Sequence, residues 1–157
     1  MSDFSQLVAS SLAGYYEEVR GRVHQWVDPL STDQLWLKPY PYGNSIGHLL
    51  LHLTGNLNYY IAAQIAGTGY LRDRDREFND PRQLPKEQVL ADFDRAIAMA
   101  AATVRQQSAE DFTKPYSAER EPEARDRFTA FFRTAAHAYD HVGQIIYLSK
   151  EVTRTAR

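Results

Sequence analysis

Apolar residues recur every three or four positions in four long segments, a spacing typical of one face of an α-helix. The first segment begins at Phe4 and should end before Pro29, because proline disfavours helical geometry in the residue preceding it. No stretch alternates as a strand does, and the sequence contains no Asn-Gly hairpin signal. The sequence therefore predicts an all-α protein whose other three helices run from a cap at Asn44 or Ser45 to Ile65, from Lys86 to Gln107, and from about Glu123 to Val152.

The connections between these helices are long, polar and rich in proline. The first, residues 30–45, offers Ser31 and Gln34 as a capping box for a single short helical turn. Connections of this length can cross the end of a bundle, so a simple up-and-down topology is not forced. We expect one domain spanning residues 1–157, folded as a four-helix bundle with long crossover connections.

Composition restricts the partners and cofactors that the chain can have. The formal net charge is −2 and both signs are mixed along the chain, which argues against nucleic acid as a partner. The densest run, "RDRDREF" at 72–78, is interpreted as a solvated loop laced with local ion pairs. With no cysteine, any metal must be held by nitrogen and oxygen. No secretory signal or membrane-length apolar run is found, so we expect a cytoplasmic protein without membrane association.

Four of the five histidines form two pairs with the same spacing. His48 and His52 lie four apart on the second predicted helix, and His137 and His141 lie four apart on the last. Two such pairs by chance would be an event on the order of one per cent. Residues four apart share a helix face, so each pair can reach one metal ion. If the two faces meet, three or four imidazoles converge between the helices.

Hydrogen-bonded core histidines are the alternative explanation for the pairs. Asn56 and Tyr59 share the histidine face of the second helix, and Gln144 follows His141 by about one turn. These side chains could serve as hydrogen-bond partners of the histidines, or could line a pocket. His24 has no spacing partner and is expected at the solvent or at a bundle edge.

Three motifs, in order, carry a resemblance to a known family. They are "NSIGHLLLHLTGNLNYYI" at 44–61, "RDREF" at 74–78 and "HAYDHVGQIIYLSK" at 137–150. The chain resembles the DinB/YfiT-like superfamily of metal-binding four-helix bundles, in an uncharacterised subfamily, over nearly its whole length. The resemblance implies that His52, His137 and His141 bind a divalent ion, such as Zn, Ni, Fe or Mn. His48 is interpreted first as a residue supporting a ligand, with a fourth ligand or a pocket wall as alternatives.

Two classes of function follow for such a site. Three imidazoles leave coordination positions open, which is typical of catalytic zinc. The resemblance implies a metal-dependent enzyme acting on a small molecule, either a thiol S-transferase using a low-molecular-weight thiol or a hydrolase, with catalytic residues unknown. The alternative is a non-catalytic, metal-binding or stress-related dimeric helical protein. A dimeric interaction module with empty histidines is a third hypothesis.

The last predicted helix has two faces that are unsuited to water. One carries the histidines, and the other carries an apolar stripe. A helix in a monomeric bundle needs only one such face, so we predict a homodimer, as the resemblance also implies. The apolar stripe consists of Phe128, Phe132, Ala135, Tyr139, Val142 and Ile146.

Overall fold

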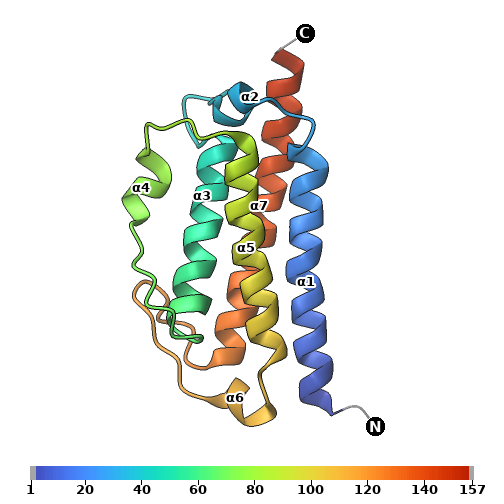
Figure 1. Ribbon diagram of the computed structural model, residues 1–157, viewed down its shortest axis with the longest axis vertical. Helices are drawn as coiled ribbons and strands as arrows, with labels where there is room; N and C mark the ends of the chain where they lie inside the picture. Colours follow the sequence, from blue (N-terminus) through green and yellow to red (C-terminus); the bar gives the residue numbers. More distant parts are fainter. Residues whose placement is uncertain (1–2, 156–157) are drawn as a thin grey trace.

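Four long helices lie side by side in the computed structural model, which describes residues 3–155 (Figure 1). Helix α1 packs against α5 and α7, and α3 packs against the same two helices. No strand occurs in the part of the chain described, which confirms the all-α prediction. The four helices are α1 (Phe4–Val27), α3 (Ile46–Leu57), α5 (Lys86–Arg105) and α7 (Arg127–Thr155).

The core lies between these four helices. Its largest fully buried side chains include Tyr16 of α1, Phe93 of α5 and Phe131 of α7. The Tyr16 hydroxyl donates a 2.8 Å hydrogen bond to the backbone carbonyl of Phe131 and lies 2.7 Å from the Thr134 hydroxyl. This buried phenol is therefore satisfied, and it fixes α1 against the part of α7 that precedes the histidines.

The helix ends predicted from local signals are confirmed. Helix α1 ends at Val27, two residues before Pro29. The capping box of Ser31 and Gln34 begins α2 (Thr32–Trp36), with the two reciprocal hydrogen bonds at 3.1 and 2.9 Å. Ser45 caps α3, since its hydroxyl accepts a 3.1 Å hydrogen bond from the backbone N–H of His48. Each of these signals acts within four residues, which explains why sequence suffices to find it.

The second predicted helix changes its winding before it ends. After Leu57 the chain continues as a π-helical segment, η1 (Asn58–Ala63). The Gln64 N–H bonds to the Tyr59 carbonyl at 3.3 Å, and the Ala66 N–H bonds to the Ile61 carbonyl at 3.0 Å. Each bond spans five residues instead of four, and such π turns often occur at functional sites.

The last helix begins later than predicted, at Arg127 instead of about Glu123. Residues 114–127 first fold back on themselves, with the Tyr116 N–H bonded to the Arg125 carbonyl at 2.9 Å. Asp126 then caps α7, because its carboxylate accepts a 2.8 Å hydrogen bond from the Thr129 N–H. The turn places residues 119–121 beside η1.

The predicted connections contain two further short helices, α4 (Arg74–Asn79) and α6 (Ala109–Thr113). Helix α4 begins at Arg74 within "RDRDREF", so the prediction of a loop is wrong from that residue on, whereas residues 73–76 are exposed as predicted. Asp73 caps α4 by accepting a 3.1 Å hydrogen bond from the Arg76 N–H. Glu77 is then turned inward and buried, at 6% exposure.

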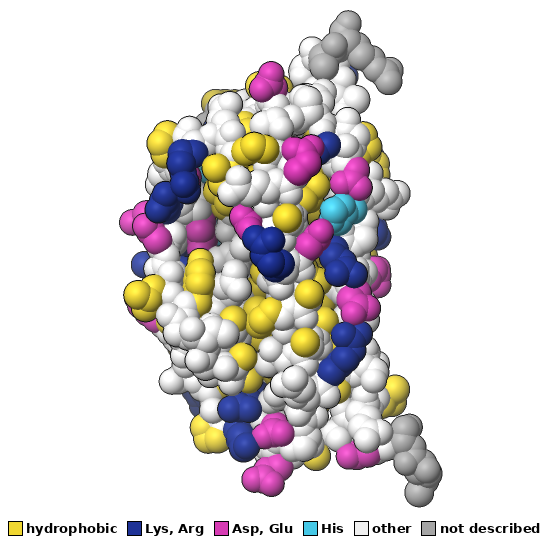
Figure 2. All heavy atoms as spheres, viewed as in Figure 1, with side chains coloured by type: hydrophobic (Ala, Val, Ile, Leu, Met, Phe, Trp, Pro, Cys, Tyr) yellow, Lys and Arg dark blue, Asp and Glu magenta, His cyan; other side chains and the backbone are white. Residues whose placement is uncertain are grey.

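The apolar stripe of α7 is divided between core and surface. Ala135 and Val142 are buried, whereas Phe128 and Phe132 are 42% and 57% exposed. The homodimer stays a prediction. Figure 2 shows basic and acidic side chains interspersed on one face of the molecule, as they are along the sequence. Within residues 3–155, no helix has the length and apolar character needed to cross a membrane.

Candidate metal centre

Three histidines from two helices converge where α3 packs against α7. One ring nitrogen from each of His52, His137 and His141 lies within 4.8 Å of the other two. The Nε2 atoms of His52 and His137 are 2.9 Å apart. His52 is buried, and the other two histidines are partly buried. The structure thus brings together the three residues to which the resemblance pointed.

The donor atoms of this group fit a divalent metal ion. The Nδ1–H of His52 donates to Glu77 at 2.8 Å, and that of His141 donates to Gln144 at 3.0 Å. These tautomers are assigned from the hydrogen bonds, and they leave an Nε2 lone pair on both rings. Zinc–nitrogen bonds of about 2.0–2.1 Å in a tetrahedral site place ligand nitrogens about 3.3 Å apart, which lies within the range of separations found here.

A buried carboxylate supports His52 from behind. Glu77 receives the His52 hydrogen bond and also two from Arg72, at 2.7 Å from Nε and 2.9 Å from Nη2. Burial alone would raise the pKa of Glu77, but the hydrogen bonds from His52 and Arg72 and the charge of Arg72 hold it below its ordinary value. The carboxylate is therefore ionised and paired. A carboxylate on the far nitrogen of a ligand histidine fixes the ring and raises its basicity.

Gly55 makes room for this carboxylate. It lies on α3, three residues after His52, and a side chain at this position would collide with the Glu77 carboxyl group. The roles of Glu77 and Arg72 were missed in the sequence, where both were assigned to a solvated run. Two signals could have found them: an interior helix glycine in "HLTGN", and the "RDREF" motif that belongs to the resemblance.

The histidines of the group are electrostatically suited to bind a cation. Burial, together with the nearby His141 and His52, lowers the pKa of His137 to about 4. Burial also lowers the pKa of His141, although its hydrogen bond to Gln144 opposes this effect. Both rings are therefore neutral near pH 7, which is the protonation state that a metal ligand requires.

The structure places His48 outside the group. Its Nδ1 lies 2.7 Å from the Ser45 hydroxyl, and its Nε2 lies 3.3 Å from the Asp80 carbonyl. Its ring packs edge-on against Trp36. With both nitrogens engaged here, His48 has no contact with the three histidines that would make it a fourth ligand or a support for one.

The other predicted residues surround the group at different distances. Asn56 is 6% exposed and lines a cavity with His52 and His137, and its Oδ1 has no hydrogen-bond partner in residues 3–155. Gln144 is exposed and bonds to His141. Tyr59 lies on η1, where its hydroxyl accepts a 3.3 Å hydrogen bond from the Glu119 N–H.

The cavity has a volume of about 590 Å³ and reaches His52 and His137. It passes between α3, α7 and the segment 119–121, and Tyr60 and Arg72 form part of its wall. A site of this size accommodates a small organic molecule. The histidine group is therefore both supported from behind by Glu77 and open on another side.

An all-α protein with a trio of histidines that could bind a metal ion is the class that fold and site define. Residues 3–156 match the family described as Protein of unknown function (DUF1572), and the chain belongs to this family. The family falls within the DinB/YfiT-like group of families, which supports the resemblance at that level. A search of curated proteins finds no match.

Proposed function

We propose that this chain is a DinB-like four-helix bundle that binds one divalent metal ion through His52, His137 and His141. The main support for this proposal is the hydrogen bond between His52 and Glu77, because histidines that only pack together do not need a buried, ionised carboxylate behind one ring. Glu77 also requires Arg72 and a glycine at position 55. The ion is Zn, Ni, Fe or Mn, since nitrogen donors do not choose strongly among them.

We further propose that the bound metal serves a metal-dependent enzyme. Three protein ligands leave a position open, and the cavity beside His52 and His137 gives a small molecule access to it. A divalent ion in such a position lowers the pKa of a thiol or water toward neutrality. Transfer of a low-molecular-weight thiol is the first reaction to test, and hydrolysis is the second.

One observation favours the alternative, a non-catalytic metal-binding protein. Glu77 is the carboxylate nearest the histidines, and both of its oxygens are already used by Arg72 and His52. It is therefore a support for His52 and not a free general base. Turnover with thiol or ester substrates, measured beside metal-free protein, separates the two functions.

Metal analysis tests the site itself. Purified protein, after dialysis and reloading with each metal in turn, should retain about one ion per chain. His137→Ala should lose the ion, because two ligands remain. His24→Ala is the matched control, since His24 contacts Asp28 and Asp94 and lies outside the group. Circular dichroism of each variant verifies folding, and wild-type protein that stays metal-free under every loading condition would refute the proposal.

A further inference from the structure

Four arginines and one glutamate line the cavity that reaches the histidines. The arginines are Arg72, Arg74, Arg120 and Arg133, and the glutamate is Glu121. The charged side chains of this wall sum to +3 (four positive less one negative). This excess contrasts with the whole chain, whose formal net charge is −2.

Two of the arginines already have carboxylate partners that neutralise them. Arg72 is buried and held by Glu77. Arg133 forms an ion pair with Glu121 and lies 3.6 Å from Glu123. The charges of these two arginines are therefore already neutralised by carboxylates of the protein itself.

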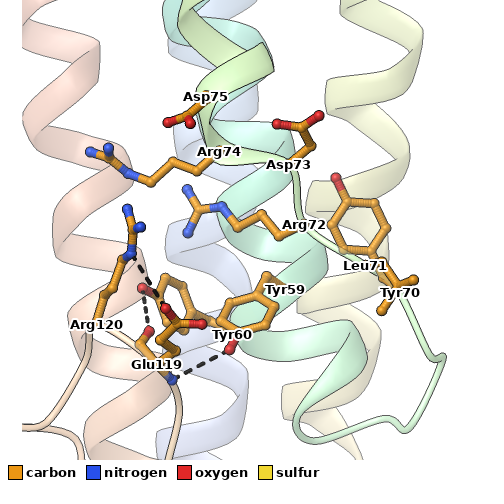
Figure 3. Close-up of a pocket in the computed structure, with 10 residues that line it drawn as sticks. All are labelled: Tyr59, Tyr60, Tyr70, Leu71, Arg72, Asp73, Arg74, Asp75, Glu119 and Arg120. Atoms are coloured by element: carbon orange, nitrogen blue, oxygen red, sulfur yellow. Dashed lines mark hydrogen bonds and ion pairs between the residues drawn. The ribbon is translucent and has the colours of Figure 1, made fainter.

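The other two arginines have little compensation. Among residues 3–155, Arg74 has no carboxylate within ion-pair distance, and its guanidinium lies 5.2 Å from the Phe78 ring centroid. Arg120 has only Glu119, at 3.8 Å, a residue whose side chain is 78% exposed. Figure 3 shows that Arg74 and Arg120 come from different segments and line the same hollow as Arg72. Like charges that line one cavity repel each other, and a bound anion would offset this repulsion.

The backbone around Arg120 holds this arrangement. Arg120 has a φ of 68°, the left-handed region that non-glycine residues rarely adopt, and such strain persists where the surroundings impose it. The residue before it is fixed on both sides: the Tyr60 hydroxyl donates to the Glu119 carbonyl at 3.2 Å, and the Glu119 N–H donates to the Tyr59 hydroxyl at 3.3 Å (Figure 3). The π-helical segment η1 thereby positions Arg120.

We infer that Arg74 and Arg120 bind an anionic group, a carboxylate or a phosphate, of the small molecule that occupies this cavity. Arginine presents paired N–H donors that match both anions. The same two arginines also line a neighbouring hollow of about 640 Å³, together with Asp73, Asp75 and Glu119. The anion lies between Arg74 and Arg120, and the rest of the molecule extends toward His52 and His137.

This inference rests on the proposed function, because it assigns a substrate class to the proposed site. Its test does not need a metal. The full chain, treated with chelator, is titrated at fixed low ionic strength with inorganic phosphate, with succinate and with neutral succinamide, and binding is followed by calorimetry. The test variants are Arg74→Gln, Arg120→Gln and the double variant. Both side chains are exposed, so folding should be retained. Arg105→Gln, at an exposed arginine paired with Glu17, is the matched control.

We expect phosphate or succinate, but not succinamide, to bind wild-type protein, and the double variant to bind at least about tenfold more weakly. A preference for phosphate or for succinate shows whether the anionic group of the bound molecule is a phosphate or a carboxylate. Binding should be unchanged in Arg105→Gln. Absence of anion binding, equal binding by the double variant, or equal binding of succinamide overturns the inference. A chain that binds the anion but no metal refutes only the proposed function, and the reverse result refutes only this inference.

Discussion

Two histidines in this protein contact carboxylates, and they do so with opposite consequences. His24 of α1 uses both ring nitrogens, with Nδ1 2.9 Å from Asp28 and Nε2 2.9 Å from Asp94 of α5. His52 of α3 uses only Nδ1 on Glu77 and turns Nε2 toward His137. The first histidine therefore has no lone pair to offer, whereas the second is held by one nitrogen and offers the other.

The carboxylates also differ in how their charges are balanced. Asp28 is exposed and Asp94 is partly exposed, so water and the histidine share the neutralisation of their charges. Glu77 is buried, and Arg72, itself buried, supplies the opposing charge. A solvated carboxylate stabilises a protonated imidazole, whereas a carboxylate already neutralised by arginine can orient a neutral one. This difference separates the exposed pair at His24 from the buried pair that we propose supports a metal ligand.

Glu77→Gln changes the buried carboxylate, and we expect it to have the largest effect on stability and on metal binding. The amide can still accept from His52, but it leaves the Arg72 charge buried and unpaired, which costs about 3–5 kcal/mol of unfolding free energy. Loss of support to a ligand histidine should also weaken metal binding about 10–100-fold. Urea unfolding of metal-free protein and competition with a chelator measure the two effects.

Asp94→Asn is the matched change at the surface site. It should cost less than about 1 kcal/mol and leave metal affinity unchanged, because the pair with His24 is partly exposed. Arg72→Met in the Glu77→Gln background should recover part of the stability by removing the stranded charge. Equal losses at both sites would show that burial does not distinguish them.

The sequence predicts the helices well where their ends depend on neighbouring residues. Pro29, Ser45 and the Ser31–Gln34 box each act locally, and each marks a boundary found in the structure. The predicted start of α7 was wrong because the true start depends on the backbone hydrogen bond between Tyr116 and Arg125 across a turn, which no helical pattern reveals. The π turn of η1 was missed because it continues the same apolar spacing.

At the candidate site, helical periodicity was not enough to tell the two histidines of α3 apart. His48 and His52 share one face and one spacing, so the pattern alone cannot separate them. Their partners do: Ser45 and Asp80 engage His48, whereas Glu77 and His137 flank His52. The resemblance selected His52, but nothing in the local charge alternation at 72–78 indicated that one acid of that run is buried.

Gly55→Ala tests whether the close approach of Glu77 is required. The new methyl group would collide with the Glu77 carboxyl group, so either that side chain or α3 must shift. We expect a loss of about 1–3 kcal/mol in unfolding free energy, together with weaker metal binding. Gly21→Ala is the control, because Gly21 is an exposed position of α1 where an added methyl group meets nothing, and the substitution should stabilise the helix by about 0.5–1 kcal/mol. Stabilisation by both substitutions would mean that the carboxylate does not need this space.

The pH dependence of the unfolding free energy tests the contacts of His24 with its two carboxylates, and the expected effect is the smallest of these predictions. Burial alone would lower the pKa of His24, but hydrogen bonds to Asp94 and Asp28 outweigh it and raise that pKa. The stability that His24 contributes is therefore fully present below its unfolded pKa of about 6.5 and is lost as pH rises through the raised folded value. His24→Gln should remove this contribution, of less than about 1 kcal/mol.

His48 should change the unfolding free energy with pH in the opposite direction to His24, and the same experiment measures it. Burial lowers the pKa of His48, so the protein loses stability as pH falls from about 6.5 through the lowered value. Urea unfolding of metal-free protein between pH 5 and 9 should therefore show His24→Gln converging with wild type at high pH and His48→Gln losing the decline at low pH. Parallel profiles for the two variants would contradict the assignment, because they would mean that the carboxylates around His24 do not outweigh its burial.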